Sequence, residues 1–115
     1  MALHRVVAHH ADCDVRVELH GVVLAVSRTP VLLHETGRPT RYYFGRDDVR
    51  WEHLEPSPTR TFCPFKGRTT AYWSARIGDT VIPDVAWCYD SPQRDVQLIA
   101  GRVAFYTEKI DLVVG

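Results

Sequence analysis

Apolar and polar residues alternate with a period of two along much of the chain. Between Val15 and Leu19, three apolar residues alternate with Arg16 and Glu18. Successive side chains of a strand point to opposite faces of its sheet, so this alternation predicts a half-buried strand. Gly21 then breaks the run, and residues 22–26 are predicted to form its hairpin partner.

Further strands are predicted wherever short apolar runs lie between turns that contain glycine or proline. They cover residues 31–35, 41–44, 59–63, 69–75, 81–89, 103–106 and 110–114. Gly67 is expected to take a positive φ in the turn that follows residues 59–63, because glycine has no Cβ to resist it. Pro83 is expected to mark a bulge in the strand over residues 81–89.

Two short helical turns are predicted between the strands. Asp47 or Asp48 is expected to cap the first, which runs through Leu54. Pro92 is expected at the first position of the second, which runs through Ile99. Many short strands, close turns and little helix predict a mainly-β fold, either a folded-over sheet or a barrel.

Length and charge narrow the class of protein. The 115 residues fit a single domain over residues 1–115, with residues 1–12 as a loosely ordered N-terminal arm. Fourteen basic residues balance fourteen acidic ones, so the basic excess typical of nucleic-acid binders is missing. Neither a signal peptide nor a membrane-spanning stretch is present in this sequence. We expect a cytoplasmic protein, monomeric or homodimeric, that contacts neither nucleic acid nor membrane.

The segment TFCPFKG at residues 61–67, followed by Tyr72 and Trp73, is the most distinctive motif. It resembles the central signature of the family described as domain of unknown function 427. Other matching positions occur in the family's order. They are Ser27, Arg28, Leu33, Glu35, Pro39, Tyr42, Tyr43, Phe44, Asp47, Asp48, Val49, Ala86, Trp87, Tyr89, Asp90, Pro92, Ile99, Gly101 and residues 103–106. The resemblance extends from about Val15 to Val114, nearly the whole chain.

The resemblance implies a β-tent-like fold, similar in shape to zinc-binding tent domains but without the metal. No Cys-x-x-Cys pair is present to supply zinc ligands. The family also carries a nucleotidyltransferase label, whose chemistry needs a phosphate-binding glycine loop and alternating carboxylates for magnesium. Asp47 and Asp48 are adjacent and would face opposite ways on a strand. We therefore expect no cofactor and no nucleotidyl transfer.

Glu35, Lys66 and Cys63 are the candidate catalytic residues. Glu35 ends an apolar strand before a turn, where a carboxylate can act as a general base; the alternative is a surface pair with an arginine. Lys66 is a candidate for anion binding or proton transfer, or else a solvated turn lysine. Its ammonium group would favour a Cys63 thiolate, although a buried cysteine is more often simple packing.

A second group of polar and aromatic residues is predicted to bind ligand, since tyrosines offer a pocket both an apolar face and a hydroxyl. This group consists of Arg28, Tyr43, Thr61, Tyr72, Trp87 and Tyr89. Arg28 is expected to clamp a carboxylate or phosphate, or to pair with Glu35. Alternation places Trp87 and Tyr89 on one face, and Tyr72 and Trp73 on opposite faces.

The histidines near the N-terminus form a weaker candidate for a metal site. His9 and His10 are adjacent and lie close to His4, Asp12 and Cys13. Neighbouring strand residues point apart, so the two histidines could chelate together only in a loop, and no metal is expected.

The leading hypothesis from the sequence is a pocket for a small polar or anionic molecule. If the domain is an enzyme, the expected chemistry is cofactor-free acid–base catalysis, such as hydrolysis, isomerisation or elimination. Glu35 would move a proton, and Lys66 would stabilise developing negative charge. The alternative is a non-catalytic module that binds a metabolite or a protein.

Overall fold

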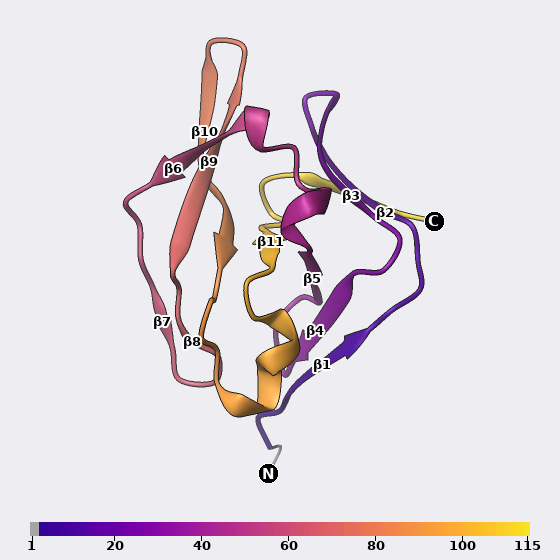
Figure 1. Cartoon of the computed structure of the whole chain (residues 1–115), viewed down its shortest axis with the longest axis vertical. Helices are drawn as coiled ribbons and strands as arrows, with labels where there is room; N and C mark the ends of the chain where they lie inside the picture. The colour runs from indigo at the N-terminus through magenta and orange to yellow at the C-terminus, as the bar shows by residue number, and fades with distance from the viewer. Residues whose placement is uncertain (1–2) are drawn as a thin grey trace.

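A computed structural model describes residues 3–115, and strands dominate this part of the chain (Figure 1). In chain order the strands are β1 (Val6–His10), β2 (Val15–Leu19), β3 (Val22–Ser27), β4 (Val31–Glu35), β5 (Arg41–Phe44), β6 (Leu54–Ser57), β7 (Phe62–Cys63), β8 (Gly67–Arg68), β9 (Ala71–Ile77), β10 (Thr80–Cys88), β11 (Val103–Phe105) and β12 (Asp111–Val114). The short helical turns are η1 (Arg46–Asp48), η2 (Trp51–His53) and η3 (Arg94–Ile99). The predicted mainly-β class is confirmed.

The strands form three antiparallel sheets that do not close into a barrel. The largest has the order β1-β4-β5-β11-β10-β9-β6, a second has the order β12-β2-β3, and β7 pairs only with β8. In the largest sheet β4 and β9 are separated by three strands. Even so, the turn between β7 and β8, which directly precede β9, contacts the end of β4. This contact requires a strongly curved sheet, which is the folded-over arrangement and not the barrel.

One face of the seven-stranded sheet packs against the three-stranded sheet. Val15, Val17 and Leu24 from the smaller sheet join Phe44 and Trp73 from the larger one in a single buried cluster. This apolar interior is the main core, since burial of such side chains is the dominant favourable contribution to folding.

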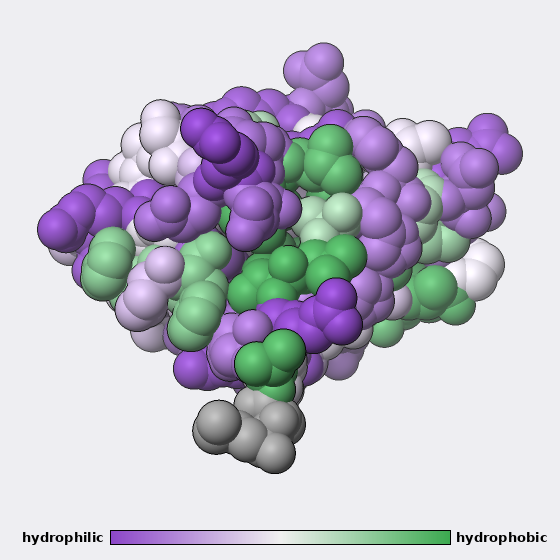
Figure 2. Space-filling view, turned by 90° about the horizontal axis from the view of Figure 1, so that it is seen from below, coloured by the Kyte–Doolittle hydropathy of each residue, from purple (hydrophilic) through white to green (hydrophobic). Residues whose placement is uncertain are grey.

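The opposite face of the same sheet carries a second core. Tyr43, Tyr72 and Trp87 are each adjacent in sequence to a residue that faces the main core, so their own side chains point to the opposite face. There they pack with Val96 and Ile99 of η3. Tyr72 and Trp73 therefore point to opposite faces, as the alternation predicted. At the end of the molecule where η3 and the N-terminus lie, apolar side chains in the middle are bordered by hydrophilic ones (Figure 2).

Several local predictions are confirmed. The observed β2, β4 and β5 have the predicted bounds. Gly67 has φ of 114° in the turn that joins β7 to β8. The register of β9 and β10 shifts between Ile82 and Ala86, on either side of Pro83, and Asp84 in this bulge has φ of 51°.

Other local predictions are wrong. Gly45, not Asp47 or Asp48, precedes η1, and no side chain caps that turn. Two 3-10 turns replace the single helical turn. Leu54–Ser57 forms edge strand β6 despite Pro56, which an edge tolerates because only one side of its backbone must pair.

Two further segments differ from the sequence prediction, one in its first residue and one in its type of structure. The turn η3 begins at Arg94, two residues after Pro92. Val6–His10, placed by the sequence in a loosely ordered arm, instead pairs with β4 as strand β1. The sequence of β1 does not predict a strand, because an edge strand that is mostly exposed shows little alternation of apolar and polar residues.

The two glycines at positions 45 and 67 provide a matched stability test. Gly67→Ala is expected to lower the free energy of unfolding by about 1–3 kcal/mol, because φ of 114° strains any residue with a Cβ. Gly45→Ala is expected to be neutral or stabilising by up to about 1 kcal/mol, because φ there is −61°. Urea denaturation of both variants measures the contrast. Equal losses in the two would contradict the assigned conformation of Gly67.

Candidate functional site

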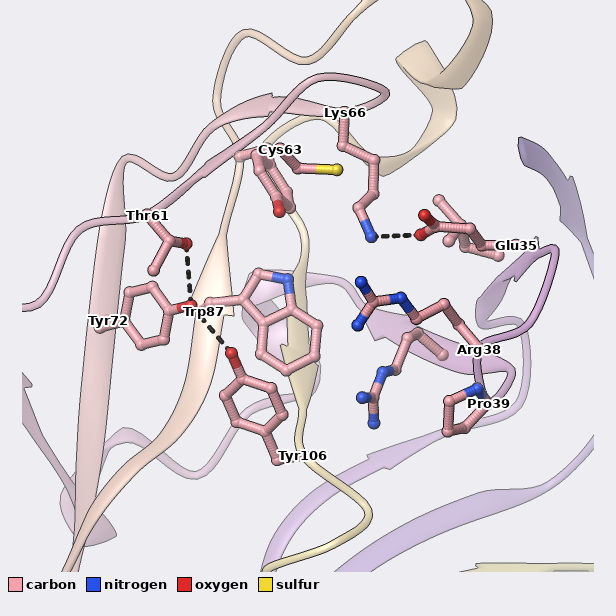
Figure 3. A pocket seen from close by; sticks show the side chains of 12 residues that line it. Glu35, Arg38, Pro39, Thr61, Cys63, Lys66, Tyr72, Trp87 and Tyr106 are labelled. Carbon is pink, nitrogen blue, oxygen red and sulfur yellow. Dashed lines mark hydrogen bonds and ion pairs between the residues drawn. The ribbon is translucent and has the colours of Figure 1, made fainter. Parts of the chain in front are cut away.

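A cavity of about 220 Å³ opens on the side of the large sheet that faces away from the three-stranded sheet. Its walls come from the end of β4, the start of β5 and the turn between them, the β7–β8 hairpin with the residue before it, β9, β10 and the segments that follow β10 and β11. Figure 3 shows that charged side chains gather on one side of it and aromatic ones on the other.

The centre of the charged side is an ion pair between Glu35 and Lys66. Lys66 Nζ donates to Glu35 Oε1 at 2.7 Å, and His4 Nε2 lies 3.0 Å from Glu35 Oε2. The side chain of Glu35 is 4% exposed and that of Lys66 is 14% exposed, so the pair is largely withdrawn from water. Both carboxylate oxygens of Glu35 are thus engaged by basic side chains.

These contacts determine the ionisation of Glu35. Burial raises the pKa of Glu35, but the hydrogen bond and charge of Lys66, assisted by His4, outweigh burial and hold that pKa below its usual value. Glu35 is therefore ionised at neutral pH. A carboxylate with a lowered pKa is a weaker general base than one tuned toward neutrality.

The position of Lys66 follows from the turn before β8. The backbone N–H of Lys66 donates to the carbonyl of Cys63 at 3.2 Å, and the Gln93 N–H donates to the Lys66 carbonyl at 2.9 Å. Gly67 lies beside the backbone of Ser91, where an added Cβ would make an ordinary contact of 3.5 Å, so the positive φ and not a close approach requires glycine here. Cys63, which is half-buried, also lines the cavity (Figure 3).

Arg41 and Trp87 form the base of the aromatic side. The Arg41 guanidinium lies 5.4 Å from the ring centroids of both Trp87 and Tyr106. Arg41 also forms a bidentate ion pair with Glu108, in which its two terminal nitrogens donate to Oε1 at 2.7 Å and to Oε2 at 3.0 Å. The Arg41 hydrogen bond lowers the pKa of Glu108 to about 2. The charge of Arg41 is therefore compensated by Glu108, and its guanidinium packs against the rings of Trp87 and Tyr106.

A chain of hydroxyl groups crosses the same wall. Thr61 Oγ1 lies 3.0 Å from the Tyr72 hydroxyl, which lies 2.9 Å from the Tyr106 hydroxyl. Burial is the main cause that raises the pKa values of Tyr106 and Tyr89 above the usual tyrosine value. These phenols therefore remain neutral at physiological pH and serve as hydrogen-bonding groups.

Arg38 completes the charged side from the turn between β4 and β5. Its backbone N–H donates to the Glu35 carbonyl at 3.0 Å, which fixes the turn beside the ion pair. Its guanidinium points into the cavity (Figure 3). Among residues 3–115 no carboxylate pairs with Arg38, whereas Arg41 and Lys66 each have one.

The structure brings most of the predicted site residues together. Those that line the cavity are Glu35, Thr61, Cys63, Lys66, Tyr72, Trp87 and Tyr89. Two residues from the sequence prediction do not line it. Tyr43 is fully buried beneath Trp87 and accepts a hydrogen bond from the Trp87 indole at 3.2 Å. Arg28 lies 3.5 Å from Asp14 on an exposed surface and does not reach Glu35.

Sequence reasoning missed Arg38, Arg41 and Tyr106. Arg38 lies in the turn directly after Glu35, and Arg41 begins the next strand, so their closeness in sequence to a proposed site was the available signal. Tyr106 had no such signal, because its contact with Tyr72 joins residues 34 positions apart.

Features outside the cavity offer less chemistry. His9 and His34 meet on adjacent strands with Nε2 atoms 2.8 Å apart. Within residues 3–115 no three histidine, cysteine or carboxylate side chains group as metal ligands. In the same range no helix has the length and apolar character needed to cross a membrane.

Comparison with known families identifies a match over most of the chain. The sequence profile of the family described as "Domain of unknown function (DUF427)" matches residues 7–115. No curated protein matches the chain.

Removal of the Glu35 charge tests the central ion pair. Glu35→Gln leaves Lys66 without its counter-charge and is expected to lower the free energy of unfolding by about 1–3 kcal/mol at neutral pH. Glu55→Gln is the control, since Glu55 and Arg76 form an exposed pair at 2.9 Å, and its loss is expected to cost below about 1 kcal/mol. Chemical denaturation compares them, and equal small losses would show that the buried pair contributes no more than the surface one.

The same variant predicts a pH dependence. Because the folded-state pKa of Glu35 is lowered, its stabilisation is present above the unfolded-state pKa and is lost as pH falls through the folded-state value. The stability difference between the wild type and Glu35→Gln is therefore expected to shrink below about pH 4. A difference that instead grew on acidification would indicate a raised pKa. Denaturation curves from neutral to acidic pH measure it.

Proposed function

The chain belongs to this family of domains of unknown function, and we propose that it binds a small anionic metabolite in the cavity between Glu35, Lys66 and Arg38. The observation that carries the proposal is the unpaired Arg38 guanidinium aimed into a cavity whose other charges already compensate one another. A guanidinium fork beside aromatic and hydroxyl groups is a typical way to hold a carboxylate or phosphate.

The charge count supports an anion. Arg38, Arg41 and Lys66 line the cavity and supply three positive charges, and Glu35 lines it with one negative charge. Glu108 does not line the cavity, but it pairs with Arg41 at 2.7 Å and supplies a second negative charge. One positive charge therefore remains without a partner. The zero net charge of the whole chain conceals this local excess.

The size of the cavity argues for a small ligand. Clefts for drug-sized ligands usually enclose about 300–1,000 Å³, and this cavity encloses about 220 Å³. A nucleoside triphosphate does not suit such a volume. Asp47 and Asp48, the only adjacent carboxylate pair, lie on η1 and do not line the cavity. Both points argue against nucleotidyl transfer.

Acid–base catalysis is the second candidate, favoured by the 2.7 Å contact between Lys66 Nζ and Glu35 inside the cavity. Lys66 would stabilise negative charge that develops on a substrate, and Glu35 would accept a proton once a substrate had displaced Lys66 from it. The lowered pKa of Glu35 makes binding the better-supported function. Retained affinity with lost turnover in Glu35→Gln would favour catalysis.

Binding can be tested with known small anions before the natural ligand is identified. We expect acetate, benzoate or inorganic phosphate to shift the indole N–H signal of Trp87 in two-dimensional NMR spectra, while those of Trp51 and Trp73 in the other core stay unchanged. Arg38→Gln is expected to weaken the affinity about 10- to 100-fold, the effect of one lost charged hydrogen bond. Arg76→Gln removes an exposed cation elsewhere and serves as the control. If no anion shifts Trp87, or if both variants behave alike, the proposal fails.

A further inference from the structure

We infer that the ligand is the monocarboxylate of a small aromatic ring, held by Arg38 and Lys66 with its ring against the aromatic wall. This inference rests on the proposed function and narrows it from anions in general to one chemical class. It combines three observations on the same cavity: the remaining charge, the donors that are free, and the nature of the wall.

The charge at the cavity favours a monoanion. Arg41 is neutralised by Glu108 and Lys66 by Glu35, so among the cations that line the cavity Arg38 alone has no counter-charge within residues 3–115. A carboxylate compensates one positive charge. A phosphate monoester is close to a dianion at neutral pH, and its second charge would lie near Glu35, whose carboxylate is 4% exposed and ionised. Two negative charges close together in a poorly solvated site repel each other, so the second charge of a phosphate would weaken its binding.

The free donors match a planar acceptor with two oxygens. The Arg38 guanidinium offers parallel N–H groups that suit a carboxylate. The Lys66 ammonium has three N–H donors and uses one on Glu35, so it retains donors for a ligand oxygen. Arg38 and Lys66 are both attached to Glu35: the Arg38 N–H donates to the Glu35 carbonyl, and Lys66 Nζ donates to the Glu35 carboxylate. The two cations therefore lie on the same side of the cavity (Figure 3).

The wall beyond these cations suits a flat ring. Tyr72, Trp87, Tyr89 and Tyr106 line it together with Leu33. Aromatic side chains prefer edge-to-face and offset contacts with another ring, which are worth about 0.5–1.5 kcal/mol beyond simple burial. Trp87 and Tyr106 are held by Arg41, so this surface exists before a ligand arrives.

Four probes separate the features of this ligand. Benzoate carries the ring and one charge, cyclohexanecarboxylate keeps the charge without the aromatic ring, phenyl phosphate keeps the ring with a second charge, and benzyl alcohol keeps the ring without charge. Calorimetric and NMR titrations of the full chain at about pH 7.5, where phenyl phosphate is mainly a dianion, give their affinities. We expect benzoate to bind at least about tenfold more tightly than benzyl alcohol and phenyl phosphate. We expect it to exceed cyclohexanecarboxylate by about three- to tenfold.

The variants connect these preferences to the residues. Arg38→Gln is expected to remove most of the difference between benzoate and benzyl alcohol, whereas Arg76→Gln is expected to retain it. Tighter binding of phenyl phosphate, or equal binding of cyclohexanecarboxylate, would overturn the inference and leave an anion site intact. If none of the three anions shifts the Trp87 signal, the proposed function itself fails.

Discussion

The ion pair between Glu35 and Lys66 joins two parts of the chain that the sheet alone would leave apart. Glu35 ends β4, and Lys66 lies in the turn of the small hairpin next to β9, three strands away in the sheet order. A contact of 2.7 Å between them links these two parts of the curved sheet, next to the apolar cluster in which Leu33 of β4 and Tyr72 of β9 also meet. The cavity lies beside this contact, so a charged interaction bounds it together with the apolar packing of the second core.

The two-residue alternation of the strands explains why a cavity can coexist with a complete core. Trp73 and Phe44 face the three-stranded sheet, and their neighbours Tyr72 and Tyr43 face the other side. The first face carries almost purely apolar side chains. The second carries tyrosines, whose hydroxyls need partners when buried. Trp87 is such a partner for Tyr43, and hydrogen bonds of this kind connect the side chains of the second face. The cavity lies beside them on the same face.

The parts of the site that could be predicted from sequence are those that local rules govern. Glu35 lies at a strand end and Lys66 in a turn whose glycine needs a positive φ, and both positions are visible in the sequence. The alternation of side chains cannot tell how deep a buried face lies, so Tyr43 was placed in the cavity although it lies beneath Trp87. Nor can it pair distant charges, which is why Arg28 was considered as a partner of Glu35 although it pairs with Asp14.

The ionisation of Glu35 decides how the cavity presents its cations. If Glu35 were neutral, Lys66 would lose its counter-charge and the cavity would favour a dianion. Because Lys66 and His4 hold the carboxylate in its charged form, the positive charge available to a ligand is reduced to that of Arg38. Under the proposed function, the same buried carboxylate that links β4 to the β7–β8 turn would restrict which anions suit the site. Its structural role and the specificity proposed for the site would then have one electrostatic cause.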